Sequence, residues 1–327
     1  MRRSQQGLSL IELMISLVIG LILVLGVVRV FSASQHGYRI QESTGRLQEN
    51  ARFAMEILGR ELRHADFFGG AVPDFIDRHA SIAVPGAACS LSWMADISRP
   101  LFAYAGAASS PLTGCTSSGY VANTDILVVR YADPSRYRTT AYFTATDEDT
   151  AQEGGLLYLR ARIGRGGYLF PFTKAVAEDA TKRAPVDGDE ASGVFSYQYA
   201  ANVYFIRNNG TVPTLYQIRM DKSGASSAQQ LVEGIEMMRL MFGVDLDGDA
   251  IIDRYLTISE MTAETWRRAL VTRVGLLVRG DALDSFLDES TYTFPDGFSY
   301  TPPAAARRFQ RRLFVQDLHL RNRTDRS

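Results

Sequence analysis

A single carboxylate lies inside the most apolar part of the chain. Residues 8–28 form an apolar segment in which Glu12 is the only charged residue. An ionised carboxylate without a partner costs at least about 2.5 kcal/mol in the hydrocarbon layer. Glu12 therefore predicts a functional contact with a cationic group inside a membrane.

The residues around Glu12 predict a single membrane anchor. Residues 8–28 would extend roughly 31 Å as a helix, which matches a hydrocarbon layer of about 30 Å. Arg2 and Arg3 precede the segment and favour a cytoplasmic N-terminus with the body on the other side. A cleaved secretory signal fits poorly, because the apolar run is too long and no small-x-small site ends it. A plain signal anchor does not explain Glu12.

The N-terminal residues resemble a known processing signal. The basic leader ending at Gly7, followed by Leu-Ser-Leu-Ile-Glu-Leu-Met, resembles the class III signal of type IV prepilins and type II secretion pseudopilins. In that family a membrane aspartyl peptidase cuts after the glycine and methylates the new N-terminus. The resemblance implies cleavage between Gly7 and Leu8 and N-methylation of Leu8, where the family usually has Phe. It also implies that Glu12 neutralises the α-amine of Leu8 on a neighbouring subunit during filament assembly.

A second set of acidic residues has the spacing of a calcium loop. Residues 245–253 place acids at positions 1, 3, 5 and 9 of that pattern, and hard cations prefer such oxygen ligands. Ala250 stands at the position of the EF-hand turn glycine, and Leu256 replaces its bidentate Glu. An acidic β-turn without metal explains the same residues equally well, and calcium binding is expected only in the millimolar range. The candidate ligands are Asp245, Asp247, Asp249, Asp253 and the carbonyl group of Ile251.

The two cysteines are predicted to form one disulfide. Cys89 and Cys115 are the only cysteines and lie in a loop-rich region of an exported body. Closing that loop would stabilise the fold by roughly 3–4 kcal/mol in the chain-entropy model. A metal or redox site is disfavoured because no Cys or His pair lies nearby.

Composition and motifs argue against several function classes. A net charge of −1 disfavours nucleic-acid binding, and 17 Phe with 15 Tyr exclude a disordered chain. The four His residues have no metalloprotease spacing, and the chain contains no G-x-S-x-G elbow, P-loop or dinucleotide fingerprint. We therefore expect a non-enzymatic protein.

Periodicity predicts the elements that position these residues. Beyond the membrane segment (8–28), an apolar stripe with helical spacing predicts a periplasmic spine over residues 29–68, ending near Phe68-Gly69-Gly70. Residues 69–327 form the expected head. The stripe consists of Leu47, Ala51, Ala54, Leu58, Leu62 and Ala65.

The head is expected to be rich in β-strands. Residues 69–125 read as irregular and bear the disulfide, whereas 126–327 read as one sheet. A short helix near 262–268 with Thr262 as N-cap interrupts the strands, and 173–193 reads as a loop. The fold class is thus α+β, a long N-terminal helix packed on a mainly antiparallel β-sheet head. The predicted strands are 126–131, 139–144, 156–162, 203–207, 215–220, 238–244, 271–279 and 313–320.

The late part of the chain carries a second resemblance. Five features of this part resemble PilW-type minor pilins. They are residues 231–238, the strand ending at Gly243-Val244-Asp245, the Asp-Gly-Asp loop, Trp266 and the terminal Leu318–Arg323. This implies a pilus-tip or priming complex that starts pilus assembly and supports twitching motility and adhesion. The implied partners are the prepilin peptidase, other minor pilins, the major pilin and a tip adhesin. The C-terminal arginines read as a solvated strand face or as a dock for an acidic neighbour.

Two alternatives share parts of this pattern. A minor pseudopilin of type II secretion carries the same N-terminal signal, and a membrane-tethered periplasmic enzyme or calcium-dependent adhesin shares the anchor. The resemblance implies a Gram-negative inner-membrane protein with a periplasmic head that later reaches the pilus tip at the cell surface.

Overall fold

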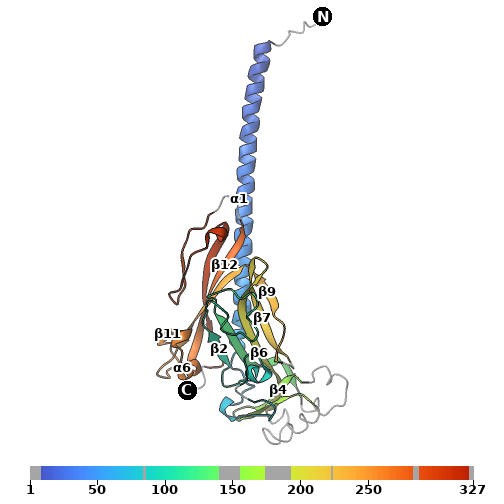
Figure 1. The fold of residues 1–327 in the computed structure, drawn as a ribbon, viewed down its shortest axis with the longest axis vertical. Helices are drawn as coiled ribbons and strands as arrows, with labels where there is room; N and C mark the ends of the chain where they lie inside the picture. Colours follow the sequence, from blue (N-terminus) through green and yellow to red (C-terminus); the bar gives the residue numbers. More distant parts are fainter. Residues whose placement is uncertain are drawn as a thin grey trace.

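One long helix and a β-rich head make up the molecule. Helix α1 (Leu10–His64) runs out of the head and carries the N-terminal end far from it (Figure 1). The α+β class and the mainly antiparallel strand pairing are confirmed. The computed structural model describes residues 9–83, 86–139, 155–173, 193–221, 224–282 and 287–323.

The larger sheet has nine strands. Its order is β1-β5-β4-β6-β3-β2, while β7 pairs with β6, and β8 and β9 pair with β7. Only the β1–β5 pair is parallel among the described strand pairs of this sheet. The strands are β1 (Ile76–Arg78), β2 (Leu101–Tyr104), β3 (Ile126–Arg138), β4 (Leu157–Arg162), β5 (Gly167–Pro171), β6 (Val194–Asn209), β7 (Val212–Asp221), β8 (Gly224–Ala225) and β9 (Gln229–Glu233).

A separate four-stranded antiparallel sheet follows in the order β11-β10-β12-β15. The prediction of one sheet over 126–327 is therefore wrong. Apolar alternation identifies a strand and its buried face, but it carries no information about which strands pair. The strands are β10 (Ile235–Val244), β11 (Arg254–Thr257), β12 (Ala269–Ala282) and β15 (Phe309–His319), and a small hairpin pairs β13 (Tyr292–Thr293) with β14 (Ser299–Tyr300).

The C-terminal half of α1 forms the centre of the main core. All six residues of the predicted stripe are at most 2% exposed, and they pack against both large sheets. A second core lies between the nine-stranded sheet and residues of the disulfide-bearing segment. The head is therefore fixed to the helix by extensive apolar burial, the dominant favourable term in folding.

Helix α1 ends earlier than predicted. Ala65 leaves helical geometry, and Asp66 adopts a positive φ of 67°. The paired glycines Gly69 and Gly70 also have positive φ, but they shape the turn that follows. The helix stops because Asp66 takes the left-handed conformation that a helix C-terminus uses, a role the sequence pattern assigned to glycine.

Four short elements lie in the segment expected to be irregular: the 3-10 helix η1 (Pro73–Phe75), β1, helix α2 (Leu91–Met94) and β2. Helix α6 (Ala263–Arg267) confirms the short helix near 262–268, and Thr262 caps it in a capping box with Thr265. Most of the predicted strand 139–144 and of the predicted loop 173–193 lies outside the described residues.

Candidate functional site

The N-terminal half of α1 is an exposed apolar rod. Its most apolar window has a mean hydropathy of 2.8, and none of it is buried in the head. The helix is continuous over 55 residues, or roughly 80 Å at about 1.5 Å per residue. This one helix is long and apolar enough to span a membrane, and it connects directly to the part that enters the head.

Glu12 lies in the first turn of this rod. Its side chain is exposed, and the described residues offer it no ion-pair partner; only its backbone carbonyl is engaged, by the Ser16 hydroxyl at 2.6 Å. Gly7 and Leu8, the expected cleavage and methylation positions, lie outside the described residues. The rod thus presents one carboxylate for a cation that the folded head does not supply.

A second helix carboxylate, Glu61, is bound inside the molecule. Its Oε2 accepts a hydrogen bond from the Asn202 amide at 2.7 Å and one from the Tyr131 hydroxyl at 3.2 Å. Burial and the charge of Glu61 raise the pKa of Tyr131 well above its usual value, so that hydroxyl stays a donor. The Glu61 bridge therefore ties α1 to the middle strands β3 and β6. Sequence reasoning missed it, because nothing local distinguishes Glu61 from the exposed acids of the helix.

The C-terminal tail holds the end of α1. The Asn322 amide donates to the carbonyl groups of Arg63 and Ala65, both at 3.0 Å. Arg323 pairs with Asp66 at 3.0 Å, and both side chains are 2% exposed. These contacts satisfy carbonyls that every helix leaves unpaired at its C-terminus.

Arg239 joins the two sheets. Its guanidinium contacts Asp125 at 3.2 Å and Asp296 at 2.6 Å, and it lies over the Phe298 ring at 4.6 Å. Burial raises the pKa of Asp125 from 3.8 to about 6, although Arg239 favours the charged form. Asp125 also accepts the Leu240 amide at 2.7 Å, which links the start of β3 to β10.

Arg311 organises the segment before β15. It pairs with Glu236 at 2.5 Å and with Asp288 at 3.2 Å, and the three side chains are 0%, 8% and 1% exposed. The interpretation of the C-terminal arginines as a solvated face is therefore wrong for Arg311 and for Arg323. A buried guanidinium needs several acceptors, and the acids come from residues distant in the sequence.

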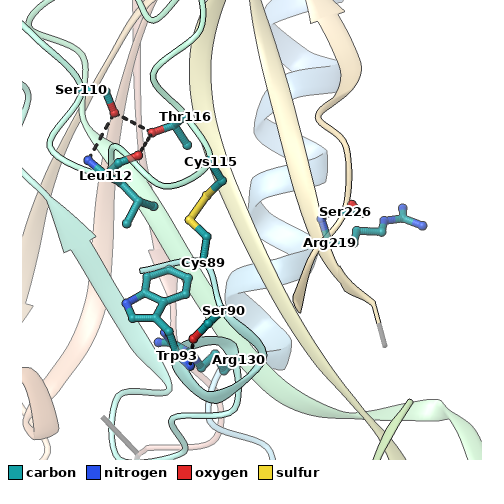
Figure 2. The surroundings of a disulfide bond; sticks show 10 residues. All are labelled: Cys89, Ser90, Trp93, Ser110, Leu112, Cys115, Thr116, Arg130, Arg219 and Ser226. Atoms are coloured by element: carbon teal, nitrogen blue, oxygen red, sulfur yellow. Dashed lines mark hydrogen bonds between the residues drawn. A yellow bond between two sulfur atoms is a disulfide. The ribbon is translucent and has the colours of Figure 1, made fainter. Parts of the chain in front are cut away.

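The predicted disulfide between Cys89 and Cys115 is present (Figure 2). Close to it, the Ser110 hydroxyl, which lies inside the loop that the disulfide closes, hydrogen-bonds at 2.6 Å to the hydroxyl of Thr116, the residue after Cys115. On the other side, the Arg130 guanidinium lies over the Trp93 ring at 4.8 Å. The disulfide thus fixes a segment that packs on the outer face of the nine-stranded sheet.

The aspartate loop gathers three of its predicted ligands. Carboxylate oxygens of Asp245, Asp247 and Asp253 lie within 4.8 Å of one another. Asp249 is outside this cluster, and its side chain accepts the amide of Ile251 at 2.8 Å. The Ile251 carbonyl has no described contact with the three carboxylates.

Backbone amides hold the loop in shape. Asp245 accepts the amides of Gly248 at 2.6 Å and Ala250 at 2.9 Å, and these bonds lower its pKa. The Asp249 amide donates to Asp247, yet burial and the neighbouring carboxylates raise the pKa of Asp247 above its usual value. The loop therefore concentrates negative charge, as a cation-binding loop requires, and calcium binding stays a prediction.

Comparisons with known proteins match both ends of the chain. Residues 2–28 match the family described as the prokaryotic N-terminal methylation motif, and residues 203–322 match Type IV Pilus-assembly protein W. No curated protein matches. Among solved structures, the type IV-like pilin TTHA1219 from Thermus thermophilus is similar, with 9% identity and a TM-score of 0.35 over 85% of this chain and 96% of that one.

Proposed function

Since this chain is a pilin-like protein of the PilW type with an N-terminal methylation motif, we propose that it is a minor pilin of a type IV pilus. In this role it joins other minor pilins in a complex at the filament tip. The complex primes polymerisation of the major pilin and supports twitching motility and adhesion.

The observation that carries this proposal is the division of α1. One half is buried in the head, whereas the other is an exposed apolar rod that bears Glu12. Such a rod is stable in a lipid bilayer or in a bundle of similar helices. A single helix allows a subunit to move from the first environment to the second without refolding its head.

Glu12 provides the contact that favours the bundle. In a filament its carboxylate would pair with the α-amine of Leu8 on a neighbour, the amine that leader cleavage after Gly7 creates. Both charges are then neutralised in an apolar setting where neither is stable alone. Prepilin peptidase and neighbouring pilins are the partners that this mechanism requires.

The head suits a periplasmic site followed by a place at the pilus tip. Its disulfide belongs to an oxidising compartment, which agrees with a head exported across the inner membrane. The head is also large, because most of the 327 residues lie in it. A tip or priming position accommodates that size.

An in-frame deletion tests the proposal. Surface pili and twitching are scored beside secreted exoenzymes, with the wild-type gene restored as the control. We expect loss of pili with normal secretion. Normal pili with blocked secretion would overturn the pilus assignment in favour of a type II secretion pseudopilin, which has the same N-terminal signal.

A further inference from the structure

Strand β15 is an unusually long open edge. The other edge strands of the described sheets, β1, β2, β8, β9 and β11, contain two to five residues, whereas β15 contains eleven. Among the described strands, β15 pairs with β12 alone. A long unpaired edge is a template for a further strand, and proteins usually shorten or cover it.

The open edge presents a regular row of backbone groups. The Leu320 amide donates to the Leu270 carbonyl at 2.9 Å, towards the β12 side. The register from there to Arg311 has no bulge, so amide direction alternates along β15. The amides of Leu313, Val315 and Asp317 therefore point away from β12, towards the open edge.

An apolar groove of about 510 Å³ lies beside this edge. Its α1 side includes Ala51, Met55 and Gly59, and its β15 side includes Phe314 and Leu318. Helix α1 and β15 approach closely at Gly59, where a Cβ would lie 3.3 Å from a Leu318 methyl group and would require that methyl group to shift by a few tenths of an ångström. A strand added to β15 would therefore cover an apolar floor.

The helix side of the groove is cationic. Arg52 and Arg63 line it, and neither has an ion-pair partner among the described residues. The acid beside them, Glu56, is already paired with Arg60 at 3.3 Å. Acidic side chains on an incoming strand would find two unpaired guanidinium groups here.

From these features we infer that β15 accepts an extended segment of a partner polypeptide as a fifth strand of the four-stranded sheet. Successive residues of an added strand face opposite sides of the sheet, so only every second residue of the segment faces α1. Among those residues, apolar ones cover Met55 and Leu318, and acidic ones near the two ends face Arg52 and Arg63. Main-chain hydrogen bonds to the open edge supply affinity, and the groove supplies selectivity. The inference concerns the head alone and holds whichever filament the subunit enters.

The test measures peptide binding to the full chain in detergent by fluorescence anisotropy. The probe is a peptide as long as β15 in which every second residue, the set that faces α1, is valine in the middle and glutamate at both ends, with threonine at the positions between. Its control has lysine in place of each glutamate. We expect the glutamate peptide to bind about tenfold more tightly than the lysine peptide. Hydrogen exchange at the amides of Val315 and Asp317 should slow when the glutamate peptide is bound.

Three variants test the open edge of β15 and the charges of the groove separately. Val315→Pro removes an outward amide while keeping the pairing with β12, and Val315→Thr keeps the amide; only the proline variant should lose binding. The double variant Arg52→Glu with Arg63→Glu leaves β15 intact and should reverse the preference between the peptides. Equal binding of both peptides by the wild type, or a preference unchanged by charge reversal, would overturn the inference.

Discussion

Two glutamates on one helix differ in where they find their partners. Glu61 lies in the half of α1 that enters the head, where Asn202 and Tyr131 donate hydrogen bonds to it. Glu12 lies in the apolar half and has no ion-pair partner among the described residues. The same side chain is satisfied by folding at one end of the helix, and we propose that assembly satisfies it at the other.

This difference separates the determinants of folding from those of assembly. A change in the buried half of α1 should alter the stability of the head, because that half is part of its core. A change in the exposed half should leave the head folded and alter only contacts with other subunits. The following predictions test that division from the largest expected effect to the smallest.

The substitution Glu12→Ala should abolish incorporation into the filament, because the α-amine of a neighbour would lose its counter-ion. The thermal midpoint of the head should not change. The measurement is complementation of the deletion strain, scored by pili and by recovery of the variant in sheared filaments. Glu49→Ala, an exposed acid farther along α1, is the matched control.

The same variant separates an assembly subunit from an independent membrane-tethered enzyme or adhesin. If Glu12→Ala is recovered in filaments at the wild-type level, the assembly role of this carboxylate is wrong. A tethered protein that acts alone would also keep its activity after this substitution.

The substitution Leu58→Ala should reduce the free energy of unfolding by about 2–5 kcal/mol, since it opens a cavity between α1 and both sheets. Leu58 is fully buried, whereas Phe53 on the same helix is 52% exposed. Phe53→Ala should therefore change stability by only about 0.5 kcal/mol. Denaturant unfolding of both variants checks the prediction. Equal effects would contradict the assignment of the Leu58 face of α1, and not its Phe53 face, to the core.

The sequence predicted what depends on local spacing. The apolar N-terminal helix, the buried stripe of α1 and the Thr262 cap all follow from residues close together in the chain. The disulfide was predictable because only one pairing of two cysteines exists.

Long-range partners were not predictable in the same way. Glu61 meets Asn202, and Arg323 meets Asp66, only after the strands have taken their order in the sheets. Alternation along a strand shows which face is buried but not its neighbour, so the division into two sheets stayed hidden. In the aspartate loop, the spacing identified the acids. It could not show that the Asp249 side chain accepts the Ile251 amide and lies outside the cluster of the other three.

Asp125 provides a buried carboxylate outside the helix for comparison. Its pKa is about 6 in the folded state, above the usual 3.8. This shift means that the folded protein favours the protonated form over the charged form by about 3 kcal/mol more than water does. The folded state therefore keeps this proton at a higher pH than the unfolded state. The contribution of Asp125 to stability should fall as the pH rises from about 4 to 6 and stay constant above that.

Carboxyl-carbon NMR of Asp125 checks this prediction. We expect a titration midpoint near 6, and Arg239→Gln should move it higher because it removes the charge that favours ionisation. A midpoint below that of the exposed acids would show that Arg239 outweighs burial, contrary to the prediction.

The substitution Glu61→Leu should cost about 1–3 kcal/mol of stability, because the buried Asn202 amide loses its acceptor. Glu61→Gln is the conservative control: its side-chain oxygen can still accept that hydrogen bond, so its cost should be smaller. Thermal unfolding of the two variants provides the measurement. Equal costs would mean that charge, rather than hydrogen bonding, makes the Glu61 bridge stabilising.

The aspartate loop resembles Glu12 in that its three clustered carboxylates have no ion-pair partner among the described residues. We expect calorimetry of the full chain in detergent to detect weak calcium binding, in the millimolar range, because three carboxylates converge there. Asp247→Ala should remove the heat, whereas Asp249→Ala should reduce it less, since Asp249 lies outside the cluster. Absence of heat with the wild type would show that backbone amides alone satisfy the loop. Glu12 would then be the described carboxylate for which a partner outside the chain is still proposed.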